Sequence, residues 1–210
     1  GMPPQAVTVL DPQPSDWVQG LAAKGLNLNT ELPESPAICI IAVKPQMMGD
    51  ALPRLQALGG GATVFLSIAA GTTIAAFERV FGADARIIRA MPNTPAAVAH
   101  GITALIGNAN ASDRDMALAE ALLRAIGQTV RLDDESQMDA VTAVSGSGPA
   151  YVFHLIETLA AAGEAEGLPA ELAMKLALVT VAGAGDLAEN AEEDPTQLRI
   201  NVTSPAGTTA

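Results

Sequence analysis

The stretch 139–159, which reads DAVTAVSGSGPAYVFHLIETL, contains residue types that could bind an anion or a carbonyl group. Asp134 and Gln137 have the spacing of a capping box, so a helix is expected to begin there and to run to Val144. The run Ser145–Pro149 then predicts a hydroxyl-rich glycine turn, because glycine frees the backbone and proline favours a first helical position.

A second helix is predicted after this turn, because the apolar residues that follow recur on one helical face: Val152, Leu155, Ile156 and Leu159. The free N–H groups at the start of that helix would point into the turn and favour a negatively charged or carbonyl ligand. The alternative is a plain corner between two helices, in which the serines act only as caps.

Three predicted strands end in residues that could also contact a ligand: Lys44-Pro45, Ala69–Gly71 and Pro92–Thr94. Lys44 places a cation where a buried strand reaches the surface, and Asn93 offers both a donor and an acceptor between two prolines. Ligands of doubly wound sheets bind at the carboxyl ends of the strands, where these residues would meet. The alternative is that the prolines and glycine only end strands and that Lys44 is solvated.

The elements that must position these residues alternate between strands and helices. Strands are predicted at residues 7–10, 38–43, 63–68, 86–90, 102–106 and 129–132, and helices at 15–24, 45–55, 74–81 and 112–126. Residues 38–43 are apolar throughout, which predicts a parallel strand buried on both faces. The alternation indicates an α/β domain over residues 1–132 with a doubly wound, mostly parallel sheet. Residues 133–210 are predicted to be all-helical, with further helices at 169–189 and after Pro195.

Asp11 follows the first predicted strand. In a Rossmann-type dinucleotide-binding fold, an acidic residue after the second strand binds the ribose hydroxyls of the cofactor. That role would make residues 7–10 the second strand, and the first strand with its phosphate turn would be missing, because no G-x-G-x-x-G occurs in these 210 residues. The alternative is that Asp11 and Pro12 merely begin a turn.

The composition restricts the class of protein and its partners. Apolar residues make up 49% of the chain and charged residues only 16%, which predicts a globular protein. The net charge of −12, without a run of Lys or Arg, argues against a nucleic-acid partner or an anionic membrane. A single cysteine, Cys39, excludes an internal disulfide, and no apolar run has the length of a membrane span. We therefore expect a cytoplasmic protein.

The two histidines and the C-terminal tail give weaker evidence of a ligand site. His100 and His154 lack Cys or carboxylate neighbours at metal-ligand spacing, so no metal site is predicted. The tail contains Gly207, Thr208 and Thr209, whose N–H groups and hydroxyls could hold a carboxylate. The alternative for the tail is a polar chain end without a ligand.

Five motifs occur in a fixed order along the chain: Ala42–Gln46 (AVKPQ), Ser67–Gly71 (SIAAG), Met91–Pro95 (MPNTP), Asp139–Tyr151 (DAVTAVSGSGPAY) and Val202–Thr209 (VTSPAGTT). This set closely resembles the pyrroline-5-carboxylate reductase family, the last enzyme of proline biosynthesis, over nearly the whole chain. The fourth and fifth motifs are quite specific to that family, whereas the first is less so.

The resemblance implies hydride transfer from NADPH or NADH to the C=N bond of 1-pyrroline-5-carboxylate, which gives L-proline. Thr142 would hydrogen-bond the ring nitrogen as proton donor, directly or through water. The carboxylate of the substrate would be held by Ser147, Gly207, Thr208 and Thr209. The nicotinamide and its ribose would be lined by Val43, Lys44, Pro45, Ala69, Ala70, Gly71, Met91 and Asn93. The family also implies a helical dimerisation domain, a homodimer or higher homo-oligomer, and an active site that the partner subunit completes.

The chain departs from the family pattern at several places. The nucleotide turn that the family carries before the start of this segment is absent, and so are several helices expected after Ala210. Ala206 replaces a glycine in the tail motif. Asp11 would repel the 2′-phosphate of NADPH, so the sequence favours NADH.

Two alternative functions remain open from the sequence. One is a related reductase of the β-hydroxyacid dehydrogenase type, which would need a lysine on the long helix; Lys175 is the only lysine there. The other is a non-catalytic dimerisation scaffold, which the missing phosphate turn favours. A scaffold should show no stabilisation by nicotinamide cofactors, which distinguishes it from both enzymes.

Overall fold

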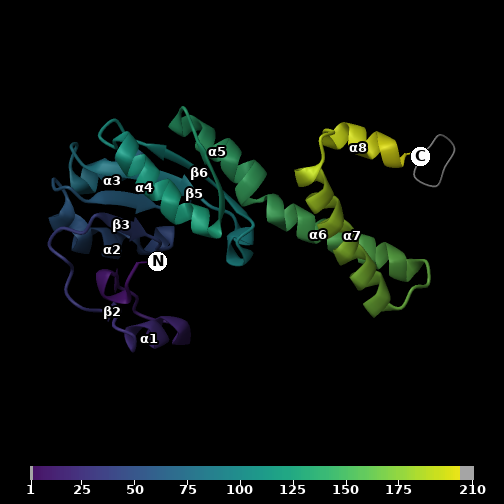
Figure 1. Cartoon of the computed structure of the whole chain (residues 1–210), viewed down its shortest axis with the longest axis horizontal. Helices are drawn as coiled ribbons and strands as arrows, with labels where there is room; N and C mark the ends of the chain where they lie inside the picture. Colours follow the sequence, from purple (N-terminus) through teal and green to yellow (C-terminus); the bar gives the residue numbers. More distant parts are fainter. Residues whose placement is uncertain (1, 204–210) are drawn as a thin grey trace. The chain divides into compact units, whose positions relative to one another are not determined.

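The computed structural model describes residues 2–203, which form two compact units (Figure 1). The first unit comprises residues 2–92 and 96–139, and the second comprises residues 93–95 and 140–203. Residues 133–139 thus pack with the first unit. The domain boundary predicted after Leu132 stays a prediction.

The first unit is built on a five-stranded sheet with the strand order β3-β4-β5-β6-β7. Its strands are β3 (Ile38–Ile41), β4 (Val64–Ser67), β5 (Arg86–Met91), β6 (Gly101–Gly107) and β7 (Gly127–Arg131). The strands β3, β4 and β5 are parallel, β6 is antiparallel to β5, and β7 is parallel to β6. The antiparallel pair follows from a connection of nine residues between β5 and β6, too short for a helical crossover.

Helices cover both faces of this sheet, as a doubly wound fold requires. On one face α2 (Met48–Leu55) and α3 (Ile74–Phe81) pack on Phe65 and Ile87, and Phe65 stacks on Phe81 with ring centroids 3.9 Å apart. On the other face α4 (Asp113–Leu123) packs on Leu66 and Ile88. Successive residues of β4 and β5 therefore enter two separate apolar clusters.

The prediction that residues 38–43 are buried on both faces is wrong. Ile40 is 51% exposed, because β3 is an edge strand of the five-stranded sheet and has a neighbour on one side only. Cys39 lies on the same strand, and burial raises the pKa of its thiol to about 11. This thiol is therefore protonated at neutral pH.

A second, two-stranded sheet lies in the N-terminal part of the first unit. β1 (Thr8–Val9) and β2 (Asn27–Leu28) pair in parallel and are connected by α1 (Asp16–Ala22), which Ser15 caps. The sequence predicted β1 and α1 but not β2. If β1 is the second strand of a dinucleotide-binding half, as the sequence predicts, the strand with the phosphate turn would lie between β1 and β3. In this structure β1 and β3 belong to different sheets.

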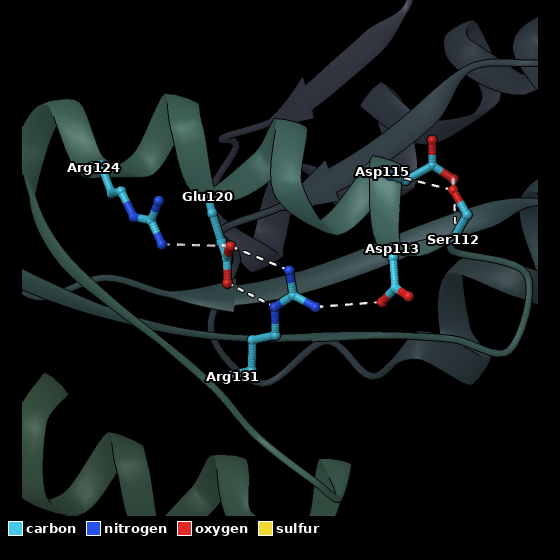
Figure 2. Close-up of polar contacts among 6 residues, drawn as sticks. All are labelled: Ser112, Asp113, Asp115, Glu120, Arg124 and Arg131. Atoms are coloured by element: carbon cyan, nitrogen blue, oxygen red, sulfur yellow. Dashed lines mark hydrogen bonds and ion pairs between the residues drawn. The ribbon is translucent and has the colours of Figure 1, made fainter.

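An ionic network joins α4 to the edge strand β7 (Figure 2). Arg131 on β7 donates through Nε to Glu120 on α4 at 2.7 Å and also pairs with Asp113 at 3.5 Å. The hydrogen bond from Arg131 is the largest of the causes that lower the pKa of Glu120 below 4.5. At the start of α4, Ser112 and Asp115 form the two hydrogen bonds of a capping box.

Asp115 is a buried carboxylate with compensating partners. Burial on its own raises the pKa of Asp115, but hydrogen bonds from the Ser112 hydroxyl and N–H and the nearby charge of Arg86 lower it below its ordinary 3.8. The ionised form is therefore stabilised, and α4 begins with an anion at its positive end.

The second unit consists mainly of α6 (Gly148–Ala165), α7 (Ala170–Asn190) and α8 (Pro195–Val202). α6 and α7 form an antiparallel hairpin in which a Cβ on Gly163 would lie 3.2 Å from the Ala173 Cβ, so glycine permits a close approach. The buried residues among those described in the two long helices are all alanines, namely Ala160, Ala173 and Ala177.

Candidate functional site

The carboxyl ends of three parallel neighbours lie at one edge of the five-stranded sheet. Lys44 follows β3, Ala69–Gly71 follows β4, and Met91 ends β5. The common edge is therefore confirmed for these strand ends, whereas their roles in binding stay predictions. Asn93 comes two residues after β5 and belongs to the second compact unit.

The loop after β4 exposes its backbone at this edge. Ala69 is buried, and its N–H donates to the Ser67 hydroxyl oxygen at 3.2 Å. Ala70 and Gly71 are exposed. Gly71 has a φ of +73°, a left-handed conformation that favours glycine, and a Cβ there would meet open space. The loop therefore offers main-chain groups without side chains that would block a planar ligand.

The loop after β3 places a cation near the same edge. Val43 is half-buried and packs against the apolar cluster below α2. Lys44 and Pro45 are exposed, and the Lys44 carbonyl oxygen accepts a hydrogen bond from Met47 N at 2.8 Å. This bond begins the short 3-10 helix Pro45–Met47, which leads into α2. The ammonium group is free to meet an anionic ligand from solvent without a large desolvation penalty.

Asp11 lies in a turn after β1. Its carboxylate accepts a hydrogen bond from Gln13 N at 2.8 Å, which is the geometry of an Asx turn. Two hydrogen bonds with the Asn29 side chain fix the Asp11 backbone, through its N–H at 2.9 Å and its carbonyl oxygen at 2.8 Å. The turn is therefore present, and it holds the carboxylate in a defined position after the strand.

The segment around Thr142 differs from the prediction. The 3-10 helix Glu135–Gln137 begins with the expected capping box between Asp134 and Gln137, and α5 (Met138–Val141) follows. Thr142–Gly146 then form a π-helical turn rather than a glycine turn that ends a helix at Val144.

The reason for this difference is the backbone at Ser147, which keeps helical angles of −88° and −22°. Its N–H donates to the Thr142 carbonyl oxygen at 2.8 Å, a bond that spans five residues. The Ser147 side chain makes no capping hydrogen bond, so the interpretation of Ser147 as a cap is wrong. π turns are frequent at functional sites because the extra residue redirects nearby groups.

The hydroxyl of Ser145 is a further polar group in this turn. Its oxygen is buried and has no hydrogen-bond partner in the part of the chain that the structure describes. Thr142 and Ser147 are both half-buried. The π turn and Ser147, which follows it, therefore place three hydroxyl groups within six residues.

Several predicted residues lie elsewhere. Gly207, Thr208 and Thr209, together with Ala206, lie outside the described residues. His100 is exposed, and His154 is an exposed partner of Glu157 at 3.5 Å. Lys175, which the dehydrogenase alternative requires, is exposed on α7.

Residues 2–203 contain neither a cluster of metal-ligating side chains nor a membrane-spanning helix. No group of three or more His, Cys, Asp or Glu side chains there could hold a metal ion. No helix in that range combines the length and apolar character needed to cross a bilayer. The cytoplasmic location stays a prediction.

A buried ion pair near the loop after β4 was missed by the sequence analysis. Arg89 on β5 is 5% exposed and donates through Nη1 to Glu135 at 2.8 Å. The available signal was an arginine inside the apolar run of β5, which must find an acceptor. The sequence does not show which carboxylate provides it, because the partners are 46 positions apart.

Comparisons with known proteins agree across both units. A model described as pyrroline-5-carboxylate reductase dimerisation matches residues 135–210. A pyrroline-5-carboxylate reductase from Synechocystis sp. is 45% identical over 86% of this chain and 67% of its own length. One from Pseudomonas aeruginosa is 39% identical over 100% of this chain and 78% of its own length.

Solved structures show the same similarity. A pyrroline-5-carboxylate reductase from Coxiella burnetii has a TM-score of 0.88 and 34% identity over 98% of this chain and 78% of that chain. A Plasmodium falciparum pyrroline carboxylate reductase with NADP bound has a TM-score of 0.82 and 30% identity over 96% of this chain and 75% of that chain.

Proposed function

Because this chain belongs to the pyrroline-5-carboxylate reductase family, we propose that it reduces 1-pyrroline-5-carboxylate to L-proline with NAD(P)H. The observation that carries this proposal is the identity of 45% and 39% to reductases across the α/β unit and the helical unit. Lys175 lies exposed on α7 and supplies no independent support for the dehydrogenase alternative.

The cofactor would supply the hydride, and the residues at the sheet edge fit its nicotinamide end. The exposed residues Ala70 and Gly71 provide main-chain polar groups, and Lys44 provides a cation. The remaining proposed contacts are Val43, Pro45, Ala69, Met91 and Asn93. These groups bind and orient the ring, which is the contribution a protein makes to hydride transfer.

Reduction of an imine needs a proton at nitrogen and a fixed carboxylate, and it needs no strong base. We assign the proton-donating hydrogen bond to Thr142, directly or through water, in the π turn. Ser147, Gly207, Thr208 and Thr209 would hold the substrate carboxylate. A hydrogen bond to the ring nitrogen strengthens as that nitrogen gains its proton, so it would lower the barrier more than it tightens binding.

The choice between NADH and NADPH depends on Asp11. Its carboxylate, fixed by Gln13 and Asn29, would accept hydrogen bonds from ribose hydroxyls and oppose a 2′-phosphate. We therefore propose a higher kcat/KM with NADH, although the Plasmodium relative was solved with NADP. Asp11→Ser should narrow or invert the ratio of the two kcat/KM values, and a strong NADPH preference in the unaltered protein would contradict the role of Asp11.

The second unit supports a homodimer. Large apolar side chains on α6 and α7 are exposed, among them Phe153 at 58% and Val179 at 60%. An exposed apolar surface of this kind marks an interaction site. The match of residues 135–210 to the dimerisation family supports a second copy of this chain as the partner, and we propose a homodimer or a higher homo-oligomer.

Steady-state kinetics of the full natural protein test the proposed function. NAD(P)H oxidation should depend on 1-pyrroline-5-carboxylate and should yield proline. Thr142→Ala should lower kcat about 100-fold, within the range for a lost proton donor, and change the cofactor KM little. Thr129→Ala removes a hydroxyl from β7, outside the proposed site, and should leave kcat unchanged. An unchanged kcat in Thr142→Ala would remove Thr142 from the mechanism.

A further inference from the structure

Arg89 is a charged residue within the sheet of the first unit. Its side chain lies on β5 between apolar neighbours and is almost completely buried. A buried guanidinium is very unfavourable without a partner, and its partner is Glu135, at 2.8 Å from Nη1. The position of Glu135, whose side chain is 29% exposed, is therefore fixed by a charge that is almost completely removed from water.

The same carboxylate oxygen has a second contact. Glu135 Oε1 accepts a hydrogen bond from Ile74 N at 2.9 Å. Ile74 is the first residue of α3, so this N–H has no partner within the helix. Thr73 caps another N–H of the same turn, that of Ala76, at 3.3 Å. A carboxylate at this end also interacts favourably with the helix dipole.

These contacts hold the loop between β4 and α3 at both of its ends. At the strand end, the Ser67 hydroxyl oxygen accepts from Ala69 N. At the helix end, Glu135 accepts from Ile74 N. Between them lies the segment Ala69–Gly71, which we propose to contact the nicotinamide and in which Ala70 and Gly71 are exposed. The conformation of this segment therefore depends on a residue that is 61 positions away from Ile74 in the sequence.

We propose that Glu135 is a positioning residue for the cofactor: paired with Arg89, it holds the N-terminus of α3 and so fixes the Ala69–Gly71 loop for the nicotinamide. This inference rests on the proposed function. It assigns to Glu135 an effect on cofactor binding that acts through Ile74, without contact between Glu135 and the cofactor.

The first unit contains a matched control for this proposal. Glu120 pairs with Arg131 at 2.7 Å, so it has the same chemistry and a similar distance. That pair joins α4 to β7 (Figure 2), and β7 is separated from β4 by two strands of the sheet. Loss of either pair should lower stability, but only loss of the Glu135 contacts should change cofactor affinity.

The test compares Glu135→Ala, Glu135→Gln, Glu120→Ala and Glu120→Gln in the full natural protein. The Kd for NADH and NADPH is measured by nicotinamide fluorescence, together with Tm, kcat and both KM values. Glu135→Ala should raise the cofactor Kd and KM about tenfold and leave the KM for 1-pyrroline-5-carboxylate within about twofold. Glu135→Gln keeps an acceptor for Ile74 N and should raise the Kd only about threefold. Both Glu120 variants should keep the wild-type Kd.

A cofactor Kd within about twofold of wild type in Glu135→Ala would overturn the proposal, whatever the change in Tm. If Glu135→Ala does not fold, Glu135→Gln and Glu135→Asp are judged by the same comparison, and an unchanged Kd in both overturns the proposal. A wild-type protein that binds the cofactor but forms no proline would contradict the proposed function instead. The Kd comparison would then still decide the role of Glu135.

Discussion

The two units of this chain bury apolar surface in opposite ways. The first unit has apolar clusters on both faces of its sheet, with Phe77, Ile87 and Leu105 at 0% exposure. In the described part of the second unit, the buried side chains of α6 and α7 are alanines, and most of the larger apolar side chains are exposed. The first unit therefore has its own core, whereas the second requires another surface to complete one.

This difference indicates how each unit contributes to function. A core of its own lets the first unit fix strand ends and loops in the way that a cofactor site needs. The second unit contains the π turn with Thr142, and its two long helices expose apolar side chains that we propose a second copy covers. Substrate binding, which involves the second unit, should therefore depend on assembly. Cofactor binding by the first unit should not depend on it.

The largest expected effect comes from truncating one phenylalanine in each unit. Phe77→Ala should lower the free energy of unfolding by about 3–5 kcal/mol, because Phe77 is completely buried and stacked near Phe81. Phe153→Ala should act through assembly, so its effect on Tm should depend on protein concentration. Thermal unfolding at low and high protein concentration separates the two. If both variants lost the same amount in Tm at every protein concentration, the distinction between the units would be wrong.

A charge on the exposed face of the second unit gives the next largest effect. Val179→Asp on α7 should weaken the dimer about 100-fold, equivalent to about 3 kcal/mol, because the carboxylate would be buried at the interface. Val130→Asp on β7 is the matched control in the first unit, where the side chain is also exposed. Analytical ultracentrifugation gives the dimer Kd of both. A dimer that tolerates Val179→Asp would show that α7 lies outside the interface.

Acid should remove the contribution that the ionic network between α4 and β7 makes to the free energy of unfolding. This effect should be smaller than those of the two preceding substitutions. The pKa of Glu120 is lowered in the folded state, so below 4.5 the unfolded chain binds more protons. The contribution of the ion pair is present above pH 4.5 and is lost as the pH falls through the lowered value. Glu120→Gln should therefore cost about 1 kcal/mol at neutral pH, and this cost should disappear in acid.

The control for the acid experiment lies in the second unit. Glu157→Gln removes an exposed partner of His154 and should leave the urea midpoint unchanged across the same pH range. A Glu120→Gln penalty that persists at low pH would show that Glu120 contributes through packing and not through its charge.

The features that the sequence predicted correctly depend on neighbours along the chain. The caps at Ser112 and Asp134 form as predicted, because their hydrogen bonds reach only two or three residues ahead. Helices on both faces of the sheet follow from the strand–helix alternation. The missed strand β2 has only two residues and exists through its pairing with β1, which periodicity does not reveal.

The sequence predicted less of the candidate site than of the fold. The strand ends with Lys44 and Gly71 were found from chain order and topology, since parallel neighbours must end at one edge. The π turn at Thr142–Gly146 replaces the predicted helix to Val144 and part of the predicted glycine turn at Ser145–Pro149, because the same residue types occur in both kinds of turn. Glu135 could not be found, because its contacts with Arg89 and Ile74 exist only in the folded chain.

The central claim is that this protein transfers a hydride to the carbon of an imine, and isotope transfer tests it directly. The full natural protein is incubated with 1-pyrroline-5-carboxylate and with NADPH or NADH that carries deuterium on the transferring face of nicotinamide C4. Because the hydride would attack the C=N carbon, the product should be proline with one deuterium on its δ carbon, as read by mass spectrometry and NMR. Absence of proline, or proline without deuterium, would contradict the account.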